Sequence, residues 1–277
     1  MGPAAGWKET LVPRRTRAHL PVPPLAAVTG CLITLAACGG DGSPEGGAAR
    51  SDSQTSTTAV IDVGDGGRYE PDVDPADFGG PIDNPYLPLL PGSRWVYEGT
   101  SDDEHERIEV VVTDERRQVM GIDAVVVRDT VTVDGEMVED THDWFAQDRD
   151  GNVWYLGEDS KEYESGQVSS AAGSWEAGVD GALPGIVMPA SPTVGQAYRQ
   201  EFYRGEAEDL AEVLRLDGSE TVAGQDYEGL LVTEEWNPLE PDAVEEKSYA
   251  PGIGLVLEVV TAGGEGRVEL TDFTPGA

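Results

Sequence analysis

The sequence lacks an apolar stretch long enough to cross a bilayer, and it has few cysteines and little positive charge. Its main apolar run, residues 25–37, is much shorter than the roughly 20 residues that a transmembrane helix needs. A retained transmembrane helix is therefore not expected. The two cysteines, Cys31 and Cys38, lie within that run and directly after it, so the domain downstream can form no disulfide.

Signatures of common hydrolases are also missing. The chain has neither the Gly-x-Ser-x-Gly turn of α/β-type serine hydrolases nor a His-Glu-x-x-His zinc helix. His105 and His142 are the histidines beyond the N-terminal region, and neither belongs to such a motif. Among so many carboxylates, pairs spaced for glycoside hydrolysis arise by chance. An envelope hydrolase that uses acidic residues is an alternative, but the sequence singles out no catalytic residue.

Acidic residues dominate the charge. The chain has 18 Lys and Arg against 53 Asp and Glu, a formal net charge of −35. Nucleic acid is excluded as a partner, because binding to phosphates requires a basic surface. A charge of this size keeps a domain soluble and favours a monomer. The acidity indicates a solvated surface, with cation binding and adaptation to high salt as the sharper interpretations.

The N-terminal residues have the three parts of an export signal. Arg14, Arg15 and Arg17 form the basic part, Leu25–Ala37 the apolar part, and Ala36 and Ala37 are the small residues beside a cleavage site. The next residue is Cys38, followed by two glycines. These features predict cleavage between Ala37 and Cys38.

Leu35-Ala36-Ala37-Cys38 resembles the lipobox of bacterial lipoproteins. The resemblance implies that the Cys38 thiol carries a diacylglyceryl group and that cleavage makes Cys38 the first residue. Two or more acyl chains hold a protein stably on a membrane. The expected partner is thus a lipid bilayer, and the expected location is the cell membrane, facing outside the cytoplasm.

Three regions follow from composition. Residues 1–37 are the predicted signal. Residues 38–83, rich in Gly, Ser, Asp and Pro, contain too few large apolar residues to offset the entropy of ordering and are predicted to be a flexible tether. Residues 84–277 are predicted to form one exported domain, a suitable length for a single core.

Short segments rich in Val, Thr and aromatic residues predict strands throughout that domain. Residues 206–216 have a spacing that suits either a helix or a strand, with a strand slightly favoured. Asp134-Gly135, Asp150-Gly151, Asp217-Gly218, Pro251-Gly252 and Gly263-Gly264 are turn signals. The predicted strands are residues 107–113, 122–133, 136–147, 197–203, 227–236, 243–249, 255–261 and 267–273.

Short connections favour antiparallel neighbours. The predicted fold class is all-β, an antiparallel meander that forms a curved sheet or an open barrel, with a β-sandwich as the alternative. Residues 84–97, 151–155 and 173–176 resemble stretches in a group of secreted bacterial β-rich proteins. That group has no assigned activity, so the resemblance implies a fold and no catalytic residue.

Asp148, Asp150 and Asn152 suggest calcium at first sight, yet the glycine follows the second Asp directly, unlike the EF-hand pattern. A hairpin turn is the favoured interpretation. A calcium-binding surface protein is an alternative function, and no other cofactor or metal is expected.

Residues 173–189 combine Gly and Pro with apolar side chains. They form either a lid over the sheet or, as the favoured interpretation, a crossover that completes the core. Trp144, Trp154 and Trp175 are candidate ligand-facing residues. The predicted function is that of a membrane-anchored, non-catalytic binding or structural module for a lipid-like or small hydrophobic ligand.

Overall fold

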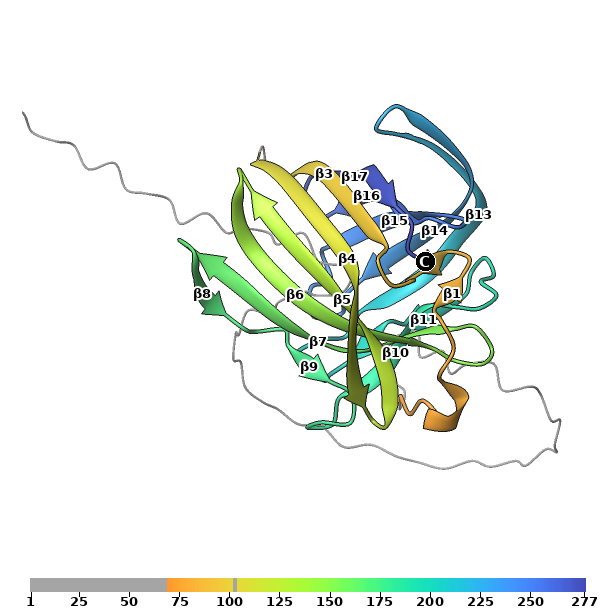
Figure 1. The fold of residues 1–277 in the computed structure, drawn as a ribbon. Helices are drawn as coiled ribbons and strands as arrows, with labels where there is room; N and C mark the ends of the chain where they lie inside the picture. The colour runs from red at the N-terminus through yellow and green to blue at the C-terminus, as the bar shows by residue number, and fades with distance from the viewer. Residues whose placement is uncertain (1–68, 102–103) are drawn as a thin grey trace, which may run out of the picture.

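The computed structural model describes residues 69–101 and 104–277, and the predictions for the signal, for Cys38 and for most of the tether lie outside these residues. Within them, no helix combines the length and the apolarity needed to cross a membrane. The described part is built from one large antiparallel sheet, a two-stranded hairpin and a single turn of 3-10 helix, η1 (Pro75–Asp77). The predicted all-β fold with a curved antiparallel sheet is therefore confirmed (Figure 1).

The strands follow the chain in a meander. The hairpin consists of β1 (Asp83–Asn84) and β2 (Leu87–Pro88). The large sheet contains β3 (Arg94–Ser101), β4 (Glu104–Val119), β5 (Ile122–Val133), β6 (Glu136–Gln147), β7 (Val153–Glu164), β8 (Gln167–Ser170), β9 (Trp175–Glu176), β10 (Leu183–Met188), β11 (Ala197–Arg199), β12 (Glu201–Phe202), β13 (Leu210–Val222), β14 (Gln225–Trp236), β15 (Val244–Ala250), β16 (Gly254–Ala262) and β17 (Gly266–Thr274).

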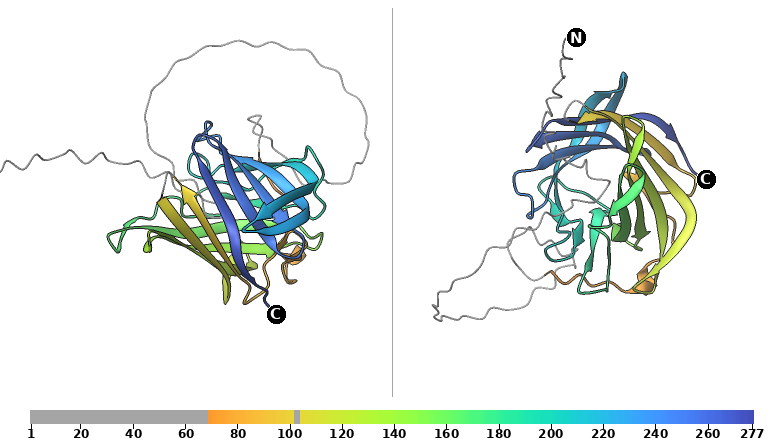
Figure 2. Two further views of the ribbon diagram at one scale, coloured as in Figure 1. Left: turned by 90° about the horizontal axis from the view of Figure 1, so that it is seen from above. Right: turned by 90° about the vertical axis from the view of Figure 1, so that its left-hand side faces the viewer.

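The sheet wraps around an interior. Its main path runs β11-β13-β14-β15-β16-β17-β3-β4-β5-β6-β7-β10-β12, and β8 and β9 both pair with β7. The two ends of this path, β11 and β12, are separated in the chain by Gln200 alone. The chain itself thus brings the ends of the sheet together, although no ladder joins β11 to β12. Figure 2 shows the sheet curling so that its early and late strands face each other.

Residues of the predicted tether pack against the domain. The Tyr69 ring makes an edge contact with Phe202, and its hydroxyl donates to the Pro184 carbonyl at 2.7 Å. Ile82 is fully buried. The packed part of the chain therefore begins before Asn84, the predicted start. Composition missed this because a few scattered apolar side chains, Tyr69, Val73, Phe78 and Ile82, carry the packing of a segment that is otherwise polar.

Two of the local predictions need correction. Asp217-Gly218 lies inside β13, where the pairing with β14 shifts register around Gly218. The chain reverses later, at Ala223 and Gly224, which have φ values of 48° and 82°. The second correction concerns residues 173–189, which were expected to be a loop: Leu183–Met188 form β10, a strand of the sheet, although Ile186, Val187 and Met188 are buried in the core as the favoured interpretation expected. Gly185 is required there, because a Cβ would lie 2.1 Å from the Gln200 carbonyl oxygen.

Candidate functional site: a buried carboxylate cluster

The interior of the wrapped sheet holds an unusual number of acidic side chains. Burying a carboxylate costs several kcal/mol unless it is paired or protonated. The buried basic side chains of the described part are Lys247 and Arg199, and Arg199 lies against aromatic rings, 4.7 Å from the centre of Phe202. The buried acidic side chains are Glu106, Asp129, Glu139, Asp143, Glu158, Glu201, Asp209, Glu235 and Glu258.

Strand register places three of these carboxylates side by side. Directly opposed residues in antiparallel strands share a face of the sheet. Asp143 of β6 is opposed by Val127 of β5 and Glu158 of β7. Asp129 lies two residues beyond Val127, so it belongs to the neighbouring row on the same face. Asp129, Asp143 and Glu158 therefore form one group across β5, β6 and β7, which we call the Asp129 group.

Hydrogen bonds leave most of the Asp129 group without a partner. Asp143 Oδ1 accepts from the Tyr155 hydroxyl at 2.7 Å. Both carboxylate oxygens of Asp129 and both of Glu158 are buried and have no hydrogen-bond partner among the described residues. Asp129 and Glu158 are each 2% exposed. Unsatisfied buried oxygens of this kind are rare and expensive in native proteins.

Burial and mutual repulsion raise the pKa of each member of the Asp129 group. Desolvation is the largest cause for all three, followed for Asp129 and Glu158 by the charge of Asp143. The pKa of Asp143 is raised to about 7, although the Tyr155 hydroxyl opposes the shift. The pKa of nearby Glu139 is also raised to about 7 by burial. At neutral pH Asp143 is thus poised between its protonated and ionised forms, while burial favours the protonated forms of Asp129 and Glu158.

A second group of carboxylates surrounds Lys247 on β15. Its Nζ lies 3.1 Å from Glu235, 3.5 Å from Glu258 and 3.8 Å from Glu245. Burial alone would lower the pKa of Lys247, but the three carboxylates outweigh it and hold that pKa well above its usual value. One ammonium cannot compensate three carboxylates, and burial beside Glu258 raises the pKa of Glu245 to about 8. We call these residues the Lys247 group.

A cavity reaches the Asp129 group from one end of the sheet. Its enclosed volume is about 20 Å³, and the space that opens from it toward solvent brings the total to about 380 Å³. The enclosed part is enough for one water molecule or one small chemical group. Its walls are apolar except where Asp129 and Asp143 reach it. The lining residues are Leu87, Leu89, Trp95, Tyr97, Val110, Val127, Asp129, Asp143, Phe145, Gly254 and Leu255.

Residues 82–92, the cap segment, close this end of the interior. The side-chain amide of Asn84 donates to the carbonyls of Gly151 and Pro189, at 3.0 and 3.2 Å. On the other side, the Gly252 amide donates to the Pro85 carbonyl at 2.7 Å. These bonds tie the cap segment to the β6–β7 turn, to the end of β10 and to the β15–β16 turn. Leu87 and Leu89 of the cap segment line the cavity.

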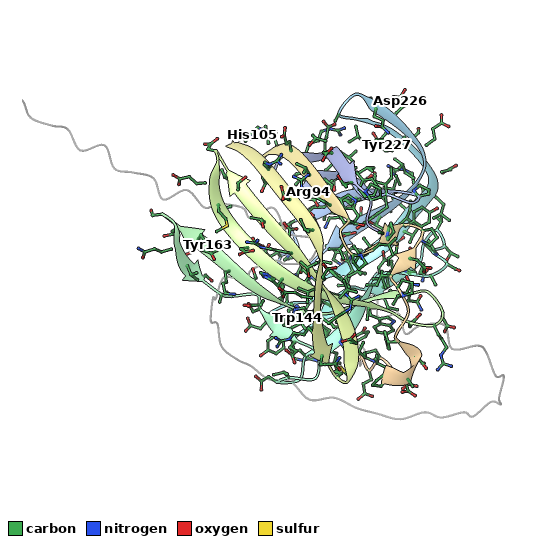
Figure 3. The ribbon with its side chains drawn as sticks, in the orientation of Figure 1. Arg94, His105, Trp144, Tyr163, Asp226 and Tyr227 are labelled. Carbon is green, nitrogen blue, oxygen red and sulfur yellow. The ribbon has the colours of Figure 1, made fainter. Side chains whose placement is uncertain are left out.

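The three tryptophans predicted to face a ligand lie elsewhere. Trp144 is buried on β6 with the Arg117 guanidinium 4.3 Å from its ring centre, and Figure 3 shows it at the opposite end of the sheet from His105. Trp154 donates from Nε1 to Asp148 at 2.8 Å. Trp175 donates from Nε1 to Glu201 at 3.0 Å. The tryptophan that lines the cavity is Trp95, and a ligand contact by the other three stays a prediction.

The Asp148 loop forms the predicted turn. Asp148 Oδ1 accepts from the amides of Asp150 and Asn152, at 3.0 and 2.9 Å, and Oδ2 accepts from Asn152 Nδ2 at 2.8 Å. Both carboxylate oxygens thus hold the turn together. Across residues 69–101 and 104–277, no group of three or more His, Cys, Asp or Glu residues is arranged to hold a metal ion. Calcium binding stays an untested prediction.

Sequence reasoning treated the interior carboxylates as a solvated surface. A signal for Asp129 was present, because it continues the alternation of Val125, Val127 and Val131 on β5, all buried. Glu158 carried no such signal, since the register of β6 and β7 shifts between Asp143 and Phe145. A bulge of this kind changes the face on which a residue lies, and the sequence alone does not mark it.

Comparisons with known proteins add one structural likeness. No family model matches the chain, and no curated protein matches it. Among solved structures, the chain is similar to a protein from Parabacteroides distasonis ATCC 8503 named "putative lipoprotein". The likeness has a TM-score of 0.38 and 11% sequence identity, and it covers 68% of this chain and 98% of the other. A likeness at this level supports no inference about the function of this chain.

Proposed function

We propose that this chain is a lipid-anchored envelope protein whose β domain is a non-catalytic binding module. The cavity behind the cap segment is its ligand site, and the ligand is a small molecule with an apolar body. The observation that carries the proposal is the cavity itself, with aromatic and aliphatic walls that end at two buried carboxylates. Apolar walls with a few convergent polar groups are typical of ligand sites.

The competing class is an envelope hydrolase that uses acidic residues. The raised pKa of Asp143 would suit a general acid. A hydrolase must bring a scissile bond of its substrate to such a group. The cavity at Asp143 leaves room for one small group behind a bonded cap segment. We therefore favour binding over catalysis.

The ligand proposal is tested on the full chain, purified from membranes and analysed by native mass spectrometry and by solvent extraction. Val110→Phe fills the cavity wall, while Val126→Phe enlarges a buried residue of β5 that is opposed by Trp144 and lies outside the cavity. We expect a small molecule to co-purify with the wild type and with Val126→Phe but not with Val110→Phe. An empty wild-type protein, or equal loading of the two variants, would contradict the proposal.

The anchor is tested separately at Cys38. Cys38→Ala removes the thiol that the lipobox resemblance assigns to acylation. We expect metabolic labelling with a fatty acid to mark the wild type and to leave the variant unlabelled. Cys31→Ala is the matched control, because Cys31 lies inside the predicted signal and its loss should leave the label unchanged. Equal labelling of wild type and Cys38→Ala would show that the anchor assignment is wrong.

A further inference from the structure

The Asp129 group brings three buried carboxyl groups together with no cation beside them. The charges that act on Asp129 come from Asp143, Glu139, Glu106 and Glu258, and every one of them is negative. Those acting on Glu158 are also all negative. By contrast, the Lys247 group contains an ammonium within 4 Å of three carboxylates. The same sheet therefore holds one carboxylate group with a built-in cation and one without.

The unpartnered oxygens of Asp129 belong to a residue of the cavity wall, where a ligand can reach them. Asp129 and Asp143 both line the cavity. Asp129 offers two oxygens without a hydrogen-bond partner. Glu158 has two more and is opposed to Asp143 across the β6–β7 ladder, but it lies outside the cavity wall. A group with several N–H donors would satisfy these acceptors at once. Charge-assisted bonds from an ammonium to carboxylates are also stronger than bonds between neutral groups.

We propose that the Asp129 group binds the ammonium of a small organic amine. The ammonium enters the cavity at Asp129 and Asp143, and the apolar part lies in the wider space that opens from the cavity toward solvent, against Trp95, Phe145 and the cap segment. This proposal rests on the proposed function and names the chemical class of its ligand. The walls favour an organic cation over a metal ion. Calcium takes six to eight oxygen ligands, whereas this cavity is lined chiefly by apolar side chains and aromatic rings. Aromatic rings attract ammonium groups.

Protons compete with the amine for the same oxygens. The ligand requires ionised carboxylates, and burial raises the pKa of Asp143 to about 7. Binding of the amine should therefore strengthen as the pH rises through about 7 and weaken below it, and it should release protons. The titratable groups around Asp129 and Asp143 are Tyr97 of β3, Glu106 of β4, Glu139 of β6, Tyr155 and Glu158 of β7, Glu201 of β12 and Glu258 of β16.

The test compares three probes of similar size on the full chain in lipid nanodiscs, by isothermal titration at pH 8. They are n-butylammonium, n-butanol and butyrate. We expect butylammonium to bind about tenfold or more tightly than butanol, with butyrate weakest. Asp129→Asn should reduce the affinity for butylammonium about tenfold or more. Asp123→Asn is the matched control, because Asp123 lies on the same strand but is exposed, and it should change nothing.

Each other outcome overturns a defined part of the account. If butanol or butyrate binds as well as butylammonium, the cavity is a ligand site but the ammonium site is wrong. If none of the three probes binds, both the ligand class and the proposed function fail. If Asp129→Asn does not fold, Glu158→Gln removes a second unpartnered carboxylate, and it should weaken butylammonium alone. Unchanged affinity in the folded carboxamide variant overturns the proposal.

Discussion

The Asp129 group and the Lys247 group occupy the same interior and solve the same electrostatic problem differently. In the Lys247 group, Thr233 and Tyr249 donate to Oε1 of Glu235 at 2.8 and 3.2 Å, and the Lys247 ammonium lies 3.1 Å from its Oε2. In the Asp129 group, Tyr155 supplies one hydrogen bond to Asp143, and Asp129 and Glu158 have none. The first group contains its own cation, which lies within 4 Å of all three carboxylates. The carboxyl groups of the second must be either protonated or bound by a cationic ligand.

This difference separates a structural role from a binding role. A buried ion pair contributes little net stability compared with apolar packing, but removing one partner leaves an uncompensated charge. We infer that Lys247 fixes the pairing of β14, β15 and β16, on which its three carboxylate partners lie. The Asp129 group instead keeps its acceptors unsatisfied, and such groups cluster at functional sites.

The largest expected effect is the removal of the built-in cation. Lys247→Met should lower the free energy of unfolding by roughly 3–5 kcal/mol at pH 8, because it leaves buried carboxylates without a counter-charge. Urea unfolding followed by circular dichroism measures this. Lys161→Met is the matched control, since Lys161 pairs with Asp159 at the surface and should contribute less than about 1 kcal/mol. Equal losses in the two variants would erase the distinction between the groups.

A smaller effect of opposite sign is expected in the Asp129 group. Asp143→Asn should raise the free energy of unfolding by roughly 1–3 kcal/mol at pH 8, because it removes a buried charge while an oxygen remains for the Tyr155 hydroxyl. Because the pKa of Asp143 in the folded chain is raised to about 7, the folded state holds the proton more tightly. The wild type therefore loses stability as the pH rises from about 4 to about 7.

The variant should lack that loss. Its advantage should consequently vanish near pH 4 and reach its full size above pH 7, as unfolding curves at several pH values would show. Asp123→Asn on the exposed face of β5 should leave the pH profile of the wild type intact. An advantage of Asp143→Asn that is constant with pH would mean that Asp143 does not titrate in this range.

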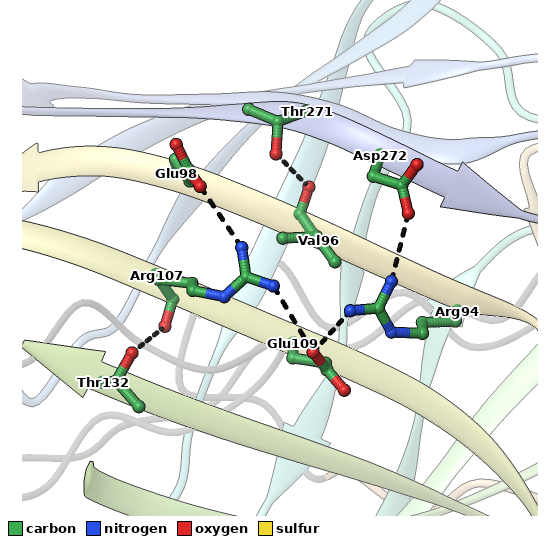
Figure 4. A network of polar contacts seen from close by, with 8 residues as sticks. All are labelled: Arg94, Val96, Glu98, Arg107, Glu109, Thr132, Thr271 and Asp272. Atoms are coloured by element: carbon green, nitrogen blue, oxygen red, sulfur yellow. Dashed lines mark hydrogen bonds and ion pairs between the residues drawn. The ribbon is translucent and has the colours of Figure 1, made fainter. Parts of the chain in front are cut away.

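The smallest effect is expected on the outer face. Arg94 and Arg107 of β3 and β4 share Glu109, at 2.6 and 3.6 Å, and reach Asp272 and Glu98 at their other ends (Figure 4). These side chains are about a third or more exposed. Glu109→Gln should therefore cost less than about 1 kcal/mol, and the loss should shrink further at high salt. A loss as large as that of Lys247→Met would show that burial does not decide the strength of these pairs.

The sequence predicted those parts of the fold that local patterns determine. Residues 122–133 and 136–147 became β5 and β6 with the predicted bounds, because Val, Thr and aromatic residues alternate between the hairpin turn at Asp134-Gly135 and its neighbours. The helix-like spacing of residues 206–216 was overridden by pairing: Leu210 and Ala211 form ladders with both β11 and β14. Local spacing carries no information about such neighbours.

Long-range packing decided what the sequence did not reveal. The glycine and proline of β10 suggested a loop, yet Gly185 is needed where β10 passes close to the backbone of Gln200. The acidic cluster depends on how β5, β6 and β7 align, and a register shift sets part of that alignment. Net charge alone indicated cation binding as one interpretation, but it could not locate the carboxylates that lack a partner.

The most direct test of the account is the titration of the interior carboxyl groups themselves, by carbon-detected NMR of the full chain with labelled Asp and Glu. We predict that Asp143 titrates at about pH 7 in the free protein, because burial disfavours its charge. On saturation with n-butylammonium its pKa should fall, since a cation favours the ionised form, and Glu245 beside Lys247 should not respond. A pKa near the ordinary value of about 3.9 for Asp143, or one that n-butylammonium leaves unchanged, would contradict the claim that this group is a binding site for an organic cation.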